Sequence, residues 1–90
     1  MDPVDRVELY WRPGCLFCAR LERALDKANV PIIKHNIWEN ADAAAFVRSV
    51  AGGDETVPTV AVGTVTLVNP GVREVTKVLE TEAPHLLHPQ

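Results

Sequence analysis

Apolar residues recur along this chain with two different periods, and each change of period marks a new element. Apolar and polar residues first alternate, which predicts a strand with Val7, Leu9 and Trp11 on one side and Arg6, Glu8 and Tyr10 on the other. After Pro13-Gly14 the period lengthens to that of a helix, whose apolar stripe consists of Cys18, Leu21, Leu25 and Ala28. The first unit is therefore a strand that leads through a turn into an amphipathic helix.

The alternation of strand and helix continues through the middle of the chain. Residues 32–38 predict a second strand, and Asn40 is suited to cap a second helix. The apolar face of this helix consists of Ala43, Phe46, Val47 and Val50. Gly52-Gly53 then supplies the left-handed residues that commonly end a helix.

Two short β-rich runs and a helix complete the pattern. Residues 59–62 and 65–68 flank a Gly-Thr pair, which with glycine first predicts a two-residue hairpin turn. We expect Asn69 to cap a last helix that has Pro70 at its first position. The inward face of that helix is predicted to consist of Val72, Val75 and Leu79.

This order of elements predicts an α/β fold with one domain. A right-handed βαβ crossover makes the first two strands parallel, and the hairpin adds antiparallel neighbours. The expected fold is a four-stranded mixed sheet with three helices on its two faces. Residues 1–82 form this domain, whereas residues 83–90, with two prolines and no periodicity, are expected to fray.

Two cysteines lie at the start of the first helix. Cys18 belongs to the buried stripe, whereas Cys15 lies at or just before the first helical residue, where backbone N–H groups lack intrahelical partners. A thiolate in such a place is stabilised, so we expect the pKa of Cys15 to lie below that of a free thiol. One exposed attacking sulfur and one covered sulfur within disulfide reach are what a dithiol oxidoreductase requires.

Composition narrows the class of protein further. The chain has 90 residues, a formal net charge of −3 and no basic stripe, so we expect no nucleic-acid partner. We expect the acidic N-terminus to be neither a signal peptide nor a membrane span, because it contains no long apolar run. A secreted disulfide scaffold would have more than two cysteines, so we expect a cytoplasmic protein with a transient, catalytic disulfide. We also expect it to be a monomer.

A structural or zinc-binding role is the alternative for the cysteine pair. Zinc usually takes four ligands, and the chain has no second pair of cysteines. His35, His85 and His88 could contribute, but two of them lie in the tail and none has the spacing of a ligand set. We therefore expect no bound metal, because two cysteines beside a βαβ pattern indicate redox chemistry first.

A second motif, Thr56-Val57-Pro58, precedes the predicted hairpin. Together with Cys15-x-x-Cys18 at a helix start, it resembles the glutaredoxin family of the thioredoxin fold, and the resemblance extends over residues 7–79. The resemblance implies that Val57 offers its backbone to the cysteinyl part of a thiol substrate. It also implies that Pro58 follows a cis peptide bond and shapes the groove beside the reactive cysteine.

The chain departs from the family pattern at three places. Between the cysteines, Leu16 and Phe17 replace the proline and tyrosine of many glutaredoxins, and Phe17 keeps an aromatic wall beside the thiol. Arg12 stands where the family often has a lysine, so its cation is expected to favour the thiolate, with a solvated surface arginine as the alternative. Asn69-Pro70-Gly71 replaces the family's Gly-Gly, the stretch that receives the γ-glutamyl carboxylate of glutathione.

The Asn-Pro variant resembles the mycoredoxins, which serve bacteria whose small thiol is mycothiol. The resemblance implies mycothiol, or else glutathione, as thiol co-substrate and no bound cofactor. Among the aromatic residues, Trp11 precedes the active-site loop and is the best candidate for substrate contact. Tyr10 and Trp38 are interpreted as packing residues.

The chain is thus interpreted as an enzyme that reduces protein disulfides and mixed disulfides between proteins and a small thiol. Cys15 attacks, and either a second small thiol or Cys18 completes the reaction. Three alternatives remain open. One is a redoxin reduced directly by a thioredoxin-reductase-type flavoenzyme. Another is a dimer that carries an iron–sulfur cluster, and the third is a non-catalytic partner-binding domain.

Overall fold

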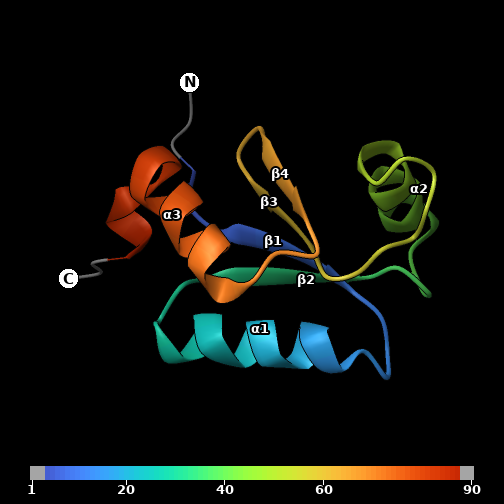
Figure 1. Ribbon diagram of the computed structural model, residues 1–90, viewed down its shortest axis with the longest axis horizontal. Helices are drawn as coiled ribbons and strands as arrows, with labels where there is room; N and C mark the ends of the chain where they lie inside the picture. The colour runs from blue at the N-terminus through green and yellow to red at the C-terminus, as the bar shows by residue number, and fades with distance from the viewer. Residues whose placement is uncertain (1–3, 88–90) are drawn as a thin grey trace.

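The computed structural model describes residues 4–87, which form one mixed β-sheet with helices on both faces (Figure 1). In chain order the elements are β1 (Val7–Trp11), α1 (Leu16–Lys27), β2 (Ile32–Asn36), α2 (Ala41–Val50), β3 (Thr59–Val62), β4 (Val65–Val68), α3 (Val72–Glu82) and the 3₁₀ turn η1 (Pro84–Leu86). The strand order is β2-β1-β3-β4, with β1 parallel to β2 and antiparallel to β3, which pairs antiparallel with β4. The predicted four-stranded mixed sheet is confirmed.

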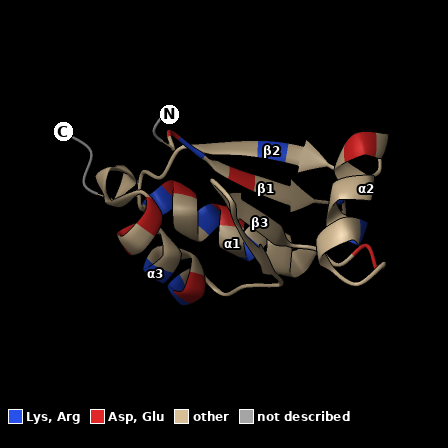
Figure 2. Cartoon of the chain, turned by 90° about the horizontal axis from the view of Figure 1, so that it is seen from above, with Lys and Arg blue, Asp and Glu red and all other residues tan. Residues whose placement is uncertain are grey.

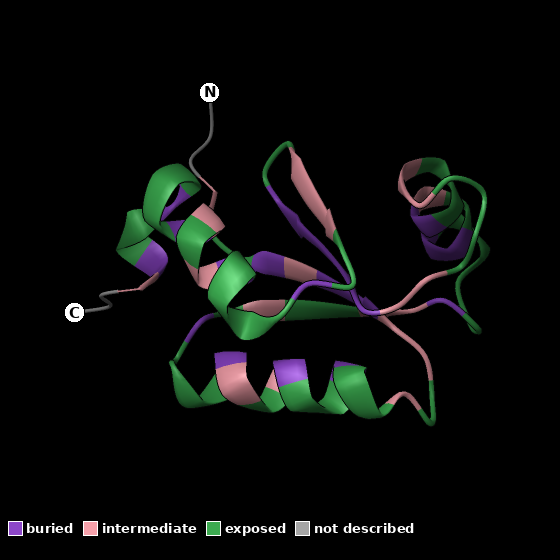
Figure 3. Cartoon of the chain, in the orientation of Figure 1, coloured by how far each residue is buried: buried purple, intermediate pink, exposed green. Residues whose placement is uncertain are grey.

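Two hydrophobic clusters hold the helices on the sheet. The larger cluster lies under α1 and α3 and includes the fully buried side chains of Leu9, Leu25 and Leu79. The smaller cluster lies under α2 and includes Tyr10 and Val47. In Figure 3 the buried residues of α1 lie on the side of the helix that faces the sheet. The first turn of α1 is therefore held beside the end of β1.

Tyr10 has the packing role expected for it. Its side chain is only 9% exposed, because α2 covers this face of the sheet. The Tyr10 ring stacks on Phe46 and on His35, each at a centroid distance of 4.7 Å. Both faces of β1 are therefore buried at this end, which the alternation of residue types did not indicate.

β2 is shorter than predicted, since it ends at Asn36 and not at residue 38. The Asn36 side chain accepts the N–H of Trp38 at 2.9 Å and donates to Glu39 at 3.0 Å, and these bonds turn the chain away from the sheet. Trp38 is 63% exposed, so the packing role expected for it was wrong. The cap predicted for α2 is confirmed, because Asn40 Oδ1 accepts the N–H of Ala43 at 3.0 Å.

α3 begins later than predicted. Asn69 has a φ of 51° and lies outside the helix, so it is not the cap. Gly71 is the cap residue, Pro70 precedes it, and Glu74 Oε1 accepts the Gly71 N–H at 3.2 Å. Val72 is 40% exposed at the helix start and does not face inward as expected.

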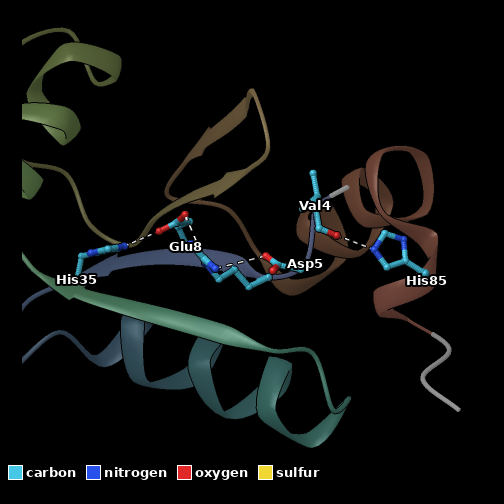
Figure 4. Close-up of polar contacts among 6 residues, drawn as sticks. Val4, Asp5, Glu8, His35 and His85 are labelled. Carbon is cyan, nitrogen blue, oxygen red and sulfur yellow. Dashed lines mark hydrogen bonds and ion pairs between the residues drawn. The ribbon is translucent and has the colours of Figure 1, made fainter. Parts of the chain in front are cut away.

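The chain beyond α3 packs on the core and does not fray from residue 83. Ala83 is fully buried and Leu86 is 7% exposed, because η1 folds both residues onto the cluster under α1 and α3. His85 Nε2 lies 2.6 Å from the carbonyl oxygen of Val4, so this turn also contacts the segment before β1 (Figure 4). The rest of the predicted tail, residues 88–90, lies outside the described residues.

Charges of both signs are distributed over the surface. Figure 2 shows acidic and basic residues interspersed along α1 and α3, with no separate basic stripe on these helices. An ion pair between Lys34 and Glu22, at 3.0 Å, joins β2 to α1. Within residues 4–87, none of the helices combines the length and the apolar character that crossing a bilayer requires.

Candidate active site

Cys15 is the N-cap residue of α1, so its sulfur lies where the helix has unpaired N–H groups. Cys15 Sγ accepts the N–H of Cys18 at 3.1 Å. The two cysteines form a disulfide with a Cα–Cα distance of 5.2 Å, and Cys18 is 3% exposed whereas Cys15 is half-buried. After reduction, the N–H donor and the positive end of the helix dipole both favour a negative charge on Cys15. The positions of the two sulfurs agree with those predicted from the helix register.

The second motif lies directly beside the cysteines. The carbonyl oxygen of Val57 is 3.9 Å from Cys15 Sγ, and the Val57–Pro58 peptide bond is cis, as the family resemblance implied. The Asn69 N–H donates to the Pro58 carbonyl at 2.7 Å. The loop between β4 and α3 therefore holds this segment against the start of α1.

Thr56 lies at the outer end of the same segment. Its carbonyl accepts a hydrogen bond from the hydroxyl of Thr59 at 2.8 Å, and Thr59 is fully buried at the start of β3. This bond ties the backbone before Val57 to the sheet. The segment is thus anchored at both ends, by β3 on one side and by Asn69 on the other.

A groove between α1 and the start of α3 opens next to the cysteine turn. This α1–α3 groove has a volume of about 340 Å³ and is lined by Phe17, Arg20, Leu21, Ala24, Asn69, Pro70, Gly71 and Val72. Phe17 is 64% exposed, so the aromatic wall predicted there is accessible to a ligand. The structure therefore places Phe17 and Asn69, which are far apart in sequence, on opposite walls of one groove.

On the α3 side of this groove, Pro70 and Gly71 offer no free N–H group to an anion. Pro70 has no N–H, and the N–H of Gly71 is bonded to the Glu74 carboxylate at 3.2 Å. Glu74 also places a negative charge at the helix start, which is the position that would otherwise attract a substrate carboxylate. On the α1 side, Arg20 supplies a cation.

A second cavity reaches the cysteines along another flank of α1. This Trp11 cleft has a volume of about 330 Å³ and is lined by Trp11, Arg12, Gly14, Cys15, Leu16, Cys18, Ala19 and Glu22. The Arg12 guanidinium lies 5.6 Å from the ring centroid of Trp38, and it donates to the Pro13 carbonyl at 3.3 Å. The structure thus places Trp11 and Arg12, both predicted as site residues, in one cavity with the cysteines.

The histidines do not converge on the cysteines. His35 Nε2 lies 2.6 Å from Glu8 Oε1, and His85 contacts Val4 at the other end of β1 (Figure 4). His88 is outside the described residues. In the part of the chain that the structure describes, no three side chains of the types that ligate metals come together.

Sequence patterns did not point to two residues of the site. Glu74 is the acidic residue that commonly lies three positions after a helix cap, but it was overlooked because Asn69 was interpreted as the cap. Trp38 contacts Arg12 from a loop that is distant in sequence, so no local pattern indicates this pair.

A family model and two relatives each match more than two thirds of this chain. The Glutaredoxin family model matches residues 7–67, which include both motifs. "Putative glutaredoxin Rv3198A" and "Putative glutaredoxin MT3292", from two strains of Mycobacterium tuberculosis, are 44% identical over 69 residues, covering 74% of this chain and 81% of each relative.

Solved structures show that the fold is thioredoxin-like. A glutaredoxin from Archaeoglobus fulgidus has a TM-score of 0.71 at 18% identity, covering 84% of this chain and 86% of its own. The NrdH-redoxin of Escherichia coli has a TM-score of 0.70 at 22% identity, covering 94% of this chain and 97% of its own.

Proposed function

Because the chain belongs to the glutaredoxin family of thiol–disulfide oxidoreductases, we propose that it reduces mixed disulfides between proteins and mycothiol. Cys15 is the attacking residue and Cys18 the resolving residue. Mycothiol supplies the electrons, and proteins that carry disulfides are the other substrates. The protein acts as a monomer in the cytoplasm, where cysteine pairs are kept reduced.

The reaction is an exchange of disulfide bonds at Cys15. The Cys15 thiolate attacks the mycothiol sulfur of the mixed disulfide, that S–S bond breaks, and the protein leaves as a thiolate that takes up a proton. Mycothiol is now bonded to Cys15. The thiolate of a second mycothiol attacks the sulfur of the bound one, which regenerates the Cys15 thiolate and releases oxidised mycothiol. Alternatively, the Cys18 thiolate attacks Cys15, releases reduced mycothiol and forms the disulfide seen in the structure.

Four residues near Cys15 orient the bound thiol in this proposal. The Val57 carbonyl, 3.9 Å from Cys15 Sγ, is close enough to pair with the cysteinyl amide of a thiol bonded there. Pro58 has no N–H of its own and is buried behind Val57, and the bond from Asn69 to its carbonyl fixes the segment. Thr56 anchors the outer end. Phe17 covers the same thiol from the side of α1.

The Glu74–Gly71 hydrogen bond is the observation that carries the choice of mycothiol. Glutathione would bring its γ-glutamyl carboxylate to the start of α3, where one donor is absent at Pro70, another is used at Gly71 and Glu74 adds a like charge. Mycothiol has a neutral acetyl group at the corresponding amine and brings no carboxylate. The mycobacterial origin of both 44%-identical relatives agrees with this choice.

Turnover with the two thiols, side by side, tests the proposal. The pure protein should reduce a mixed disulfide faster with mycothiol than with glutathione at matched thiol concentration. The Cys15→Ser variant should be inactive, whereas Cys18→Ser should retain the reaction that uses a second mycothiol. Equal or faster turnover with glutathione would refute the choice of thiol. Activity in Cys15→Ser would refute the assignment of the attacking residue.

A further inference from the structure

The Trp11 cleft contains groups that the disulfide exchange itself does not use. Its lining includes two charged side chains, Arg12 on the loop before α1 and Glu22 on the second turn of α1. The lining also includes the apolar side chains of Trp11 and Leu16 and both residues of the cysteine pair. A cavity with apolar walls and a few placed polar groups is the usual form of a small-molecule site.

Each tryptophan of the chain lies against a cation, Trp11 in the lining of the cleft against Lys34, and Trp38 outside the lining against Arg12. Lys34 Nζ lies 5.2 Å from the ring centroid of Trp11 and 3.0 Å from Glu22, and the Arg12 guanidinium lies 5.6 Å from the centroid of Trp38. The turn that carries Trp38 is itself tied down, because Ile37 N–H donates to the Trp11 carbonyl at 2.9 Å. Trp11 and Arg12 are therefore each in contact with a residue outside the lining of the cleft.

Arg12 and Glu22, which both line the cleft, suit a ligand with hydroxyl groups better than a ligand with a single charge. A guanidinium has five N–H donors, and within residues 4–87 the hydrogen bond from Arg12 to the Pro13 carbonyl uses one of them. Glu22 binds Lys34 through one carboxylate oxygen, which leaves the other as an acceptor. A hydroxyl group both donates and accepts. The C–H face of a sugar ring also packs well on the indole of Trp11.

We propose that the Trp11 cleft is the subsite for a polyhydroxylated ring carried by the small thiol. The inference rests on the proposed function, since the thiol must be bonded to Cys15 for its substituents to reach the cavity. A cysteine-based thiol has two arms, one on its amine and one on its carboxyl group. The small acyl arm enters the α1–α3 groove, and the sugar arm enters the Trp11 cleft, where Arg12 and Glu22 bind its hydroxyl groups.

The two indole N–H groups allow a direct test in the Cys18→Ser protein. Its mixed disulfides with mycothiol, with N-acetylcysteine and with glutathione are prepared, and the indole resonances are assigned with Trp11→Phe and Trp38→Phe. The mycothiol adduct should shift the Trp11 indole resonance relative to the N-acetylcysteine adduct, which has the same acyl group and no sugar. Identical indole positions in these two adducts would overturn the subsite.

The kinetics of the Glu22→Ala variant test the sugar subsite independently of whether the protein prefers mycothiol to glutathione. Loss of the acceptor should raise KM about fivefold more for the mycothiol mixed disulfide than for that of N-acetylcysteine. Glu80→Ala, an exposed change on α3, is the matched control and should leave both unchanged. Equal effects on both substrates would overturn the sugar subsite even if the wild type prefers mycothiol. A larger effect on a protein disulfide that lacks any sugar would show that the cleft binds a protein side chain and would also overturn it.

Discussion

At the scale of single residues, Cys15 owes its expected reactivity to its place at the helix cap. Its sulfur accepts the N–H of Cys18 at 3.1 Å, an interaction that is stronger for a thiolate than for a thiol. Cys18 is 3% exposed and lies on the buried stripe, so reagents reach it less easily. The two thiols therefore differ in both charge and access once the disulfide is reduced.

Alkylation of the reduced protein at mildly acidic pH should label Cys15 before Cys18. Only the thiolate reacts, and the Cys18 N–H and the positive end of the helix dipole both favour a thiolate at Cys15. Peptide mass after a short reaction with iodoacetamide gives the order of labelling. Preferential labelling of Cys18 would contradict the assignment of the attacking residue.

Glu74→Gln should make glutathione a better substrate. The amide still accepts the N–H of Gly71, so the helix cap survives, but the negative charge near the substrate carboxylate is gone. Removing a charge at a helix terminus changes binding by about 0.3–1 kcal/mol, or roughly two- to fivefold in KM for glutathione. Glu80→Gln on the same helix is the control. An unchanged KM for glutathione would show that Glu74 does not select the thiol.

At the scale of elements, local signals predicted most of the secondary structure. The cap at Asn40, the hairpin with Gly63 at a φ of 61° and the helix that follows Cys15 are all confirmed, because neighbouring residues alone determine them. The start of α3 was misplaced because the Asn69 N–H binds the Pro58 carbonyl, a contact between distant segments. No local pattern contains that information.

Asn40→Ala should destabilise the protein through α2. The side chain satisfies the N–H of Ala43, and losing such a cap typically costs about 1 kcal/mol. For a domain of this size that corresponds to a fall in Tm of roughly 4–8 °C. Asn40→Ser keeps an acceptor at the cap and should stay within a degree or two of the wild type by the same reasoning. Thermal unfolding of the two variants gives the comparison, and equal losses of stability would exclude capping as the cause.

At the scale of the whole molecule, the active site depends on segments that meet only in the fold. The fold class and both sequence motifs could be predicted, since each motif is contiguous in the chain. The α1–α3 groove could not, because one wall comes from α1 and the other from residues 69–72, which meet only in the fold. The Trp11 cleft is lined by residues 11–22 alone, but the local pattern does not show that their side chains enclose a cavity. The contact between Arg12 and Trp38 illustrates this, with one residue before α1 and the other after β2.

Because both faces of the sheet are packed, the stability of the fold also depends on pH in the alkaline range. Burial, and next the nearby charge of Glu8, raise the pKa of Tyr10 above its ordinary value. As pH rises above about 10, Tyr10 therefore ionises in the unfolded chain before it ionises in the folded protein. The free energy of unfolding should fall in that range. Tyr10 is the chain's single tyrosine, so Tyr10→Phe should show a smaller fall in urea titrations. Identical pH dependence in the two proteins would contradict this.

The central claim is that Cys15 reacts with a sugar-bearing thiol in preference to glutathione. Reduced Cys18→Ser protein, in which Cys15 is the single cysteine, is mixed with equal concentrations of the disulfides of mycothiol and glutathione and quenched with acid at successive times. Intact mass measures which adduct forms first. The mycothiol adduct should accumulate first. A glutathione adduct that forms faster, or a Cys15 that forms neither adduct, would contradict it.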